Sequence, residues 1–160
     1  MDTLQFTQAP VAEAAMLIRR PVTDVFEAFI DPAITSNFWF TRGSGRLEEG
    51  KQVQWDWEMY HVSTQVKVLA IEEHKRILVE WSGYGTPTQV EWIFTPFQEH
   101  ATFVHITNKG FSGNGDEQVK QALSSTEGFT VVLAGLKAFL EHNVNLHLIL
   151  DRHPAGLQKE

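Results

Sequence analysis

Acidic residues beside tryptophans are the first candidates for chemistry in this sequence. They form the pairs Asp56-Trp57, Glu80-Trp81 and Glu91-Trp92, and Glu58 follows the first pair. Two carboxylates with different pKa values can act as general acid and base, as they do in glycosidases. Successive side chains of a strand point to opposite faces, however, so each pair separates its acid from its tryptophan. We expect the acids to face solvent and the tryptophans to face the interior; the opposite register would line a pocket with acids.

Histidines and serines form no complete set of metal-binding or catalytic groups in the sequence. His100 and His105 are spaced so that they point to opposite faces of one strand, and there is no His-Glu-x-x-His motif. Zinc needs three or four converging ligands, so we expect no metal site. Ser124 and Ser125 fall inside a predicted helix without a nucleophile elbow. The sequence leaves enzymatic activity open, does not favour it, and identifies no catalytic residue.

A glycine-rich run, residues 110–115, precedes the last predicted helix. Helix N-termini bind phosphate, but no Gly-Lys-Ser/Thr follows here and the preceding strand belongs to an antiparallel meander. We therefore expect no nucleotide and no other cofactor. Because glycine-rich loops move easily, we interpret the run as a gate at the mouth of a pocket.

Two periodicities define the elements that must position these residues. Apolar residues at helical spacing predict helices, and alternation of apolar with polar residues predicts a meander between Gly43 and Lys109. The expected strands are residues 12–20, 51–59, 62–71, 76–81, 89–94 and 101–108, and the expected helices are residues 21–30, 33–38 and 116–142. A single long helix must cover the apolar face of a curved sheet, so the sequence predicts an α+β, helix-grip fold.

The long predicted helix carries a stripe whose residues change in size along its length. Ala122 and Ser125 occupy one end, and larger apolar residues continue the stripe. Small residues on a buried face leave space where leucine would normally fill it, so we expect a cavity opposite them. Gly128 and Gly135 flank the stripe. Glycine costs about 1 kcal/mol relative to alanine inside a helix, so we expect another backbone to approach closely at both positions.

The predicted ligand site is a cavity with an aromatic wall on the sheet and small residues on the helix. Its expected lining is Trp55, Trp57, Thr64, Val66, Val79, Trp81, Trp92, Phe94, Val104, Asn108, Ala122, Ser125, Phe129 and Leu133. The tryptophans and Phe129 would supply stacking surface, whereas Asn108, Ser125 and Thr64 would orient the ligand. For any one of these residues taken alone, a filled core is the alternative.

Three stretches resemble a known superfamily. They are Arg20 to Pro32 with Asn37-Phe38-Trp39-Phe40, then Thr107 to Phe111, and Gly128-Phe129 in the long helix. These stretches resemble the START-like, or polyketide cyclase/dehydrase (SRPBCC), superfamily. The closest resemblance is to relatives of the C-terminal domain of the activator of the heat-shock-protein-90 ATPase. The resemblance covers about residues 12–154.

The resemblance implies a deep pocket between sheet and helix that holds lipids, aromatic polyketides or other hydrophobic molecules. Some members of the superfamily use it for cyclisation or hydrolysis. The sequence departs from the pattern at Phe129, where the family often has Trp, and at Asn108, where it often has His. A chaperone-associated interaction module is a further function that the resemblance allows.

Composition and charge narrow the function classes. The 160 residues predict a single domain, and the absence of cysteine excludes disulfides and fits a cytoplasmic protein. A formal net charge of −7 argues against nucleic-acid binding, and no continuous apolar run suggests membrane insertion. We expect binding of a small hydrophobic or aromatic ligand; a cyclase- or hydrolase-type enzyme and a chaperone-associated module are alternatives. Homodimerisation is compatible with the sequence.

Overall fold

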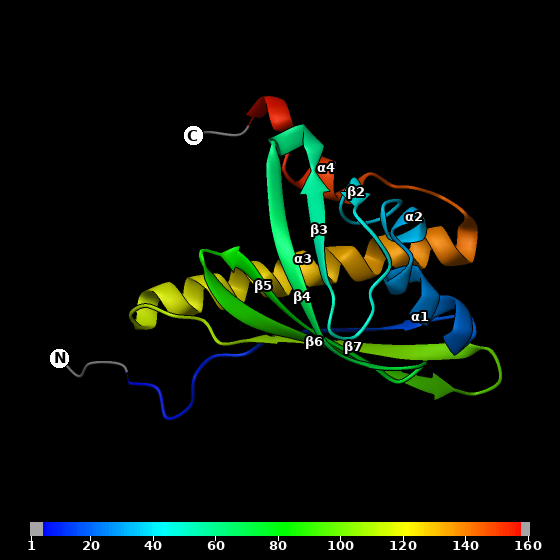
Figure 1. Ribbon diagram of the computed structural model, residues 1–160, viewed down its shortest axis with the longest axis horizontal. Helices are drawn as coiled ribbons and strands as arrows, with labels where there is room; N and C mark the ends of the chain where they lie inside the picture. The colour runs from blue at the N-terminus through cyan, green and yellow to red at the C-terminus, as the bar shows by residue number, and fades with distance from the viewer. Residues whose placement is uncertain (1–4, 158–160) are drawn as a thin grey trace.

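An antiparallel sheet of seven strands curls around one long helix (Figure 1). The computed structural model describes residues 5–157, except for the side chains at positions 83 and 84. The elements are β1 (Ala12–Ile18), α1 (Val22–Ile30), α2 (Pro32–Thr35), β2 (Arg42–Gly43), β3 (Gln52–Trp57), η1 (Glu58–Tyr60), β4 (Val62–Glu72), β5 (Arg76–Tyr84), β6 (Thr86–Phe97), β7 (Ala101–Lys109), α3 (Gly115–His142), α4 (Leu148–Arg152) and η2 (Ala155–Leu157). The strand order is β1-β7-β6-β5-β4-β3-β2. The α+β helix-grip fold is thereby confirmed.

The predicted meander is correct in order but not in every boundary. The expected strand 51–59 is too long, because β3 ends at Trp57 and Met59 lies in the short helix η1. Strands β5 and β6 are longer than predicted, because Gly85 takes a φ of +89° and lets the two strands pair up to Tyr84 and Thr86. Helix α2 is shorter than expected, and β2 and α4 were not predicted.

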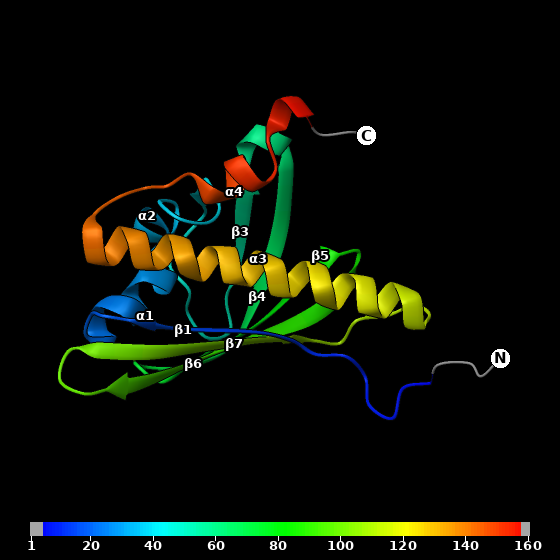
Figure 2. The same cartoon turned by 180° about the vertical axis from the view of Figure 1, so that it is seen from behind.

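Strands β3 and β4 rise steeply away from β6 and β7 (Figure 1). The register shifts between Val68 and Ala70 in β4, and again between Trp81 and Tyr84 in β5. Such irregularities bend a strand and increase its twist. The bent sheet therefore offers a concave face, and α3 crosses that face (Figure 2).

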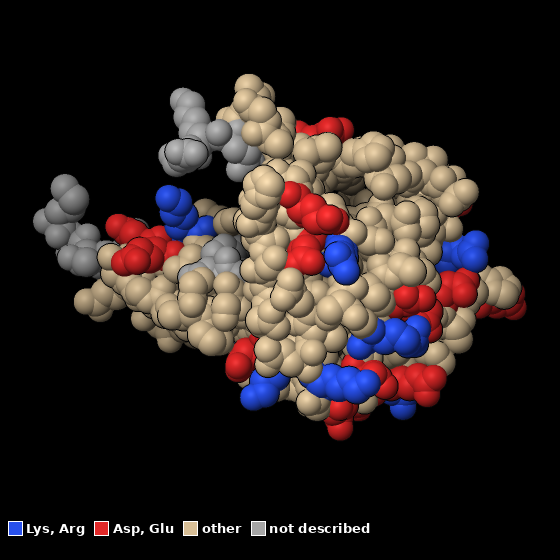
Figure 3. Space-filling view, turned by 45° about the horizontal axis from the view of Figure 1, so that its top comes forward, with Lys and Arg blue, Asp and Glu red and all other residues tan. Residues whose placement is uncertain are grey.

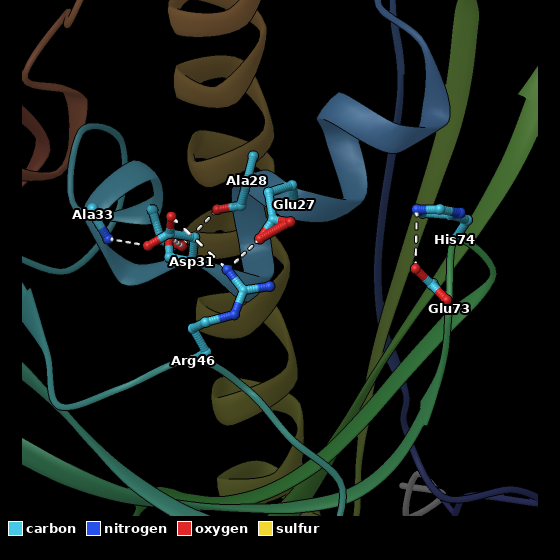
Figure 4. A network of polar contacts seen from close by, with 8 residues as sticks. Glu27, Ala28, Asp31, Ala33, Arg46, Glu73 and His74 are labelled. Atoms are coloured by element: carbon cyan, nitrogen blue, oxygen red, sulfur yellow. Dashed lines mark hydrogen bonds and ion pairs between the residues drawn. The ribbon is translucent and has the colours of Figure 1, made fainter.

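Helices α1 and α2 close one end of the concave face. A polar network fixes the end of α1 (Figure 4). The guanidinium of Arg46 lies 2.5 Å from a carboxylate oxygen of Glu27 and 3.9 Å from one of Asp31. The Asp31 side chain also accepts from the backbone N–H of Ala33 and so caps α2. These contacts hold the chain between β2 and β3 against the end of α1.

The long helix α3 begins with a capping box. The Asn114 side chain accepts from the backbone N–H of Glu117, and the Glu117 side chain accepts from that of Asn114. By length and composition alone α3 could span a membrane. Its buried stripe instead packs in the interior of the domain, as core helices of soluble proteins do; the buried residues are Ala122, Ser125, Phe129, Val132, Leu133, Gly135 and Leu136.

Candidate functional site

A hollow of about 430 Å³ lies between the middle of α3, the start of β4 and the segment that follows α3. We call it the aromatic hollow. Its lining residues come from the chain after α2, from β3, η1, β4 and β5, from α3 and from the segment after α3. They are Trp39, Trp57, Tyr60, Val62, Ser63, Thr64, Trp81, Ser82, Ser124, Ser125, Gly128, Phe129, Val132, Ile149 and His153. Hollows of this size are typical of small-molecule sites.

Aromatic rings form the inner wall of the aromatic hollow. The ring centroid of Trp81 lies 5.9 Å from those of Trp39 and Phe129, and Trp57 lies 6.5 Å from Trp81. Trp39 and Phe129 are themselves 5.6 Å apart in a T-shaped arrangement. Rings at such distances stabilise one another in tilted and edge-to-face geometries. The wall is therefore held in place by ring–ring contacts within the protein.

Gly128 provides the room on the helix side. A Cβ atom built at Gly128 would meet nothing within 4 Å, so the expected close backbone approach is wrong at this position. At Gly135 it is confirmed, because a Cβ atom would lie 3.2 Å from both the Cβ and the carbonyl oxygen of Phe38. The two glycines of one helix thus serve opposite purposes. One leaves space open, and the other lets α3 lie against the chain that follows α2.

The small-residue end of the stripe is only partly at the aromatic hollow. Ser125 lines it, but Ala122 packs with Ala12 and Phe111 in a separate small cluster. The expected position of Ala122 opposite the cavity is therefore wrong. The stripe fixes the direction in which a side chain points but not the turn at which the sheet moves away from the helix.

Asn108 is fully buried and hydrogen-bonded within the protein. Its Nδ2 donates to Thr88 Oγ1 at 3.0 Å and to the carbonyl oxygen of Gln89 at 2.8 Å. Its Oδ1 accepts from Ser125 Oγ at 2.8 Å. The amide that we expected to orient a ligand instead connects β7, β6 and α3. Satisfied buried networks of this kind fix the position of the elements that they join.

The predicted lining residues divide between the aromatic hollow and the filled core. The structure brings Trp57, Thr64, Trp81, Ser125 and Phe129 together at the hollow. It places Trp55, Val66, Val79, Trp92, Phe94, Val104, Asn108 and Leu133 in the buried interior behind it. The lining residues that the sequence did not predict include Trp39, Tyr60, Ile149 and His153. Trp39 lay in a stretch that carried the family resemblance, whereas no sequence signal pointed to the residues after α3.

The acids lie on the outer face, as expected from the alternation. Asp56 accepts from Ser63 Oγ at 2.6 Å and from Gln54 Nε2 at 2.8 Å, and these bonds lower the pKa of Asp56. Glu91 pairs with Arg76, whose Nε lies 2.6 Å away. Within residues 5–157 no group of three or more His, Cys, Asp or Glu side chains could hold a metal ion.

The glycine-rich run does not have the position that we expected. None of the described residues 110–115 lines the aromatic hollow. Phe111 is buried beside Ala12 and Ala122, and Ser112 shares a hydrogen bond with Thr86 at 2.7 Å. The run connects β7 to α3, and the prediction that it gates the mouth of the hollow is wrong.

Comparisons with known proteins agree with this geometry. Protein SSP2350 from Staphylococcus saprophyticus is 30% identical, with a TM-score of 0.73 over 85% of this chain and 95% of its own. DynU16, from the dynemicin biosynthetic locus, is 22% identical, with a TM-score of 0.74 over 85% of this chain and 49% of its own. The Aha1 dimer from Colwellia psychrerythraea is 17% identical, with a TM-score of 0.70 over 82% of this chain and 96% of its own.

No curated protein matches the chain. One family model does, over residues 19–141, and its description is "Activator of Hsp90 ATPase homolog 1-like protein". The match spans α1, strands β2 to β7 and nearly all of α3, and it includes all lining residues of the aromatic hollow except Ile149 and His153. The chain belongs to the family of activator of Hsp90 ATPase homolog 1-like proteins.

Proposed function

We propose that the protein binds a flat, uncharged, hydrophobic molecule in the aromatic hollow. The observation that carries this proposal is the lining itself. Its inner wall is made of Trp39, Trp57, Trp81 and Phe129, and the lining also includes the hydroxyl-bearing residues Thr64, Ser82 and Ser124. Aromatic walls with a few polar groups are typical of sites for small apolar ligands.

The charge of the ligand follows from the same lining. Among the described lining residues there is no Lys, Arg, Asp or Glu. A charged ligand would lose its hydration there without gaining a counter-ion, which is costly. On the face that Figure 3 shows, Lys and Arg lie beside Asp and Glu rather than in a basic patch. The site therefore favours neutral molecules over fatty acids and other anions.

A pair of probes with the same ring system tests this proposal. We expect acetylnaphthalene, which is neutral, to quench tryptophan fluorescence and to bind about tenfold more tightly than the naphthoate anion or better. Native mass spectrometry of freshly purified protein would independently reveal a retained neutral molecule. Absence of binding by a panel of flat neutral compounds, together with absence of any retained molecule, would contradict the proposal.

Filling the aromatic hollow provides the matched variant. Gly128→Leu places a side chain in open space inside the hollow, so we expect it to weaken acetylnaphthalene binding by about tenfold or more. Thr130→Leu adds the same side chain to the exposed face of α3 and should leave binding unchanged. Equal binding by wild type and Gly128→Leu would show that the ligand site lies elsewhere.

Catalysis on the bound molecule is the alternative function. It would require two titratable groups that reach the ligand. Tyr60 and His153 are the titratable side chains among the described lining residues. The Tyr60 hydroxyl already donates to the backbone of His153, and burial raises the pKa of Tyr60. The lining thus supports binding better than acid–base chemistry.

The proposal that this chain associates with other proteins rests on the similar proteins alone. The similar structure from Colwellia psychrerythraea is described as a dimer, and the family is named for activation of the Hsp90 ATPase. At 17% identity that structure supports the fold and no more. Homodimerisation and chaperone association of this chain therefore remain proposals, and sedimentation equilibrium with and without Hsp90 tests both.

A further inference from the structure

The segment after α3 turns back across the aromatic hollow. We call residues 143–153 the strap. It leaves the C-terminal end of α3 and runs back toward the tips of β3 and β4 (Figure 2). Asn143 and His147 both take a φ of 54°, in the left-handed region, and they bracket an exposed stretch before α4. Exposed residues with few neighbours are the usual places where a chain can bend as a hinge.

The strap forms one wall of the aromatic hollow. Ile149 and His153 are lining residues of that hollow. Ile149 and Trp39 also line a second hollow of about 220 Å³, which lies between the strap and the chain that follows α2. The Ile149 side chain therefore stands between two spaces. Because the second space is not filled by side chains, the strap has room to move once Ile149 leaves its contacts with the core.

Few interactions hold the strap against the body of the protein. The Tyr60 hydroxyl donates to the carbonyl oxygen of His153 and lies 3.3 Å from that of Ile149. Arg152 forms an ion pair with Glu127, and the two side chains are 52% and 47% exposed. Exposed pairs of this kind contribute little to stability. Helix α4 has no fully buried residue, and its apolar restraint comes from the partly buried Ile149, which packs against the core.

The end of α3 beside the strap is held much more firmly. Glu141 accepts from the backbone N–H of Arg19 at 2.8 Å and from Lys137 Nζ at 2.7 Å. Lys137 Nζ also donates to the carbonyl oxygen of Leu17 at 3.0 Å. The helix is thus tied to the end of β1 up to its last turn. The change from firm to weak attachment falls at Asn143, where the left-handed conformation ends the helix.

We propose that the strap is a gate that opens about Asn143 to admit the ligand, with Tyr60 as its latch. The inference rests on the proposed binding function and adds the route by which the ligand enters. Opening moves Ile149 and His153 away from the aromatic hollow and joins it to the second hollow. Closing restores the wall and the hydrogen bond from Tyr60. The strap therefore controls both the association and the dissociation rate of the ligand.

Cross-linking the strap tests the proposal directly. The sequence has no cysteine, so Glu127→Cys with Arg152→Cys can be joined specifically by a short bismaleimide. Neither residue lines the aromatic hollow. In stopped-flow fluorescence with acetylnaphthalene, we expect the cross-link to slow association and dissociation about tenfold or more, with a much smaller change in Kd. The control is the same double variant with both thiols capped by N-ethylmaleimide.

Two outcomes separate the gate from the binding function. Rates that are equal in the cross-linked and the capped protein would overturn the gate, even though the ligand binds. If wild-type protein binds no probe, the binding function fails, and hydrogen exchange then decides whether the strap moves. We expect backbone amides of α4 to exchange at least about a hundredfold faster than those near Leu136, and faster still in Tyr60→Phe. Equal protection of α4 and the core of α3 would overturn the gate on its own.

Discussion

The two halves of α3 meet the same sheet in opposite ways. Around Leu133 and Leu136 both side chains are completely buried and the interior is solid. Around Ser125 and Gly128 the sheet wall stands away from the helix and leaves the aromatic hollow. Both halves belong to the same helix, face the same sheet and lie near aromatic side chains. The difference lies in the size of the side chains on the helix and in the distance to the opposite wall.

Under the proposed function, this contrast separates the part of the fold that provides stability from the part that binds the ligand. The filled half gains free energy from apolar burial and dense packing, and any loss there leaves a cavity. The open half gives up that packing and keeps its aromatic surface available to a ligand. Variants that act on one half should therefore leave the other half nearly unchanged, which makes the contrast measurable.

Neighbouring tryptophans on β3 give the largest expected difference. Trp55 is 2% exposed and stacks on Phe40, with ring centroids 5.0 Å apart, whereas Trp57 is half-buried and lines the aromatic hollow. We expect Trp55→Ala to lower the free energy of unfolding by about 3–5 kcal/mol, since it empties a filled site. Trp57→Ala should cost less than half of that but abolish most of the binding of acetylnaphthalene.

Urea unfolding and fluorescence titration of the two variants measure both effects. The comparison would fail if Trp57→Ala destabilised the protein as much as Trp55→Ala, because the aromatic hollow would then be part of the solid core. It would also fail if Trp55→Ala had the same free energy of unfolding as wild type and lost only the binding of acetylnaphthalene.

The same contrast explains how far sequence patterns can predict this site. Alternation in β3 placed Trp55 and Trp57 correctly on one inward face, because strand periodicity is local. It could not show that one is buried behind Trp39 while the other opens onto a hollow, since that depends on the bend of the sheet. Ala122 was misplaced for the same reason. A helical stripe shows to which side of the helix a side chain points, but it does not show how far away the opposite wall lies.

Contacts between residues of distant elements could not be predicted from the sequence. Tyr60 meets the strap because η1 forms at the tip of β3 and β4, where the strand was expected to continue to Met59. Ile149 reaches the aromatic hollow only after the chain reverses at Asn143. Asn108 was correctly placed on the inward face, but its partners Thr88 and Ser125 come from other elements. Such pairings follow from topology rather than from local pattern.

Acid sensitivity separates the tied end of α3 from the outer face of the sheet and gives a smaller effect. The Glu141 side chain is 9% exposed. Burial alone would raise its pKa, but hydrogen bonds from Lys137 and the backbone N–H of Arg19 prevail and lower it. A carboxylate whose pKa is lower in the folded state stabilises the protein above its unfolded value, about 4.3, and loses this contribution as the pH falls through the folded value.

We therefore expect Glu141→Gln to lower the free energy of unfolding at neutral pH by about 1–3 kcal/mol. The gap between wild type and variant should shrink below about pH 4. Urea unfolding at neutral and acidic pH measures it. Asp56→Asn is the control, because Asp56 also has a lowered pKa but a solvated carboxylate, and its removal should change stability little. A pH-independent gap would show that Glu141 acts through packing alone.

The smallest effect comes from the two helical glycines and is the sharpest test of the contrast. Gly128→Ala places a methyl group in open space, so the higher helix propensity of alanine should raise the free energy of unfolding by about 0.5–1 kcal/mol. Gly135→Ala has the same gain in propensity, but its Cβ would lie 3.2 Å from the carbonyl oxygen of Phe38. Crowding against fixed backbone costs about 1–3 kcal/mol, so this variant should be less stable than wild type.

Urea unfolding of the two alanine variants gives the signs directly. A gain in the free energy of unfolding at one glycine and a loss at the other would show what sets the role of each glycine. It would be the distance from α3 to the neighbouring chain rather than helix propensity. Two equal gains would mean that Phe38 moves aside easily and that α3 is not held closely at Gly135. Two equal losses would mean that Gly128 is needed by something other than open space, and the aromatic hollow would then have to be smaller than its lining indicates.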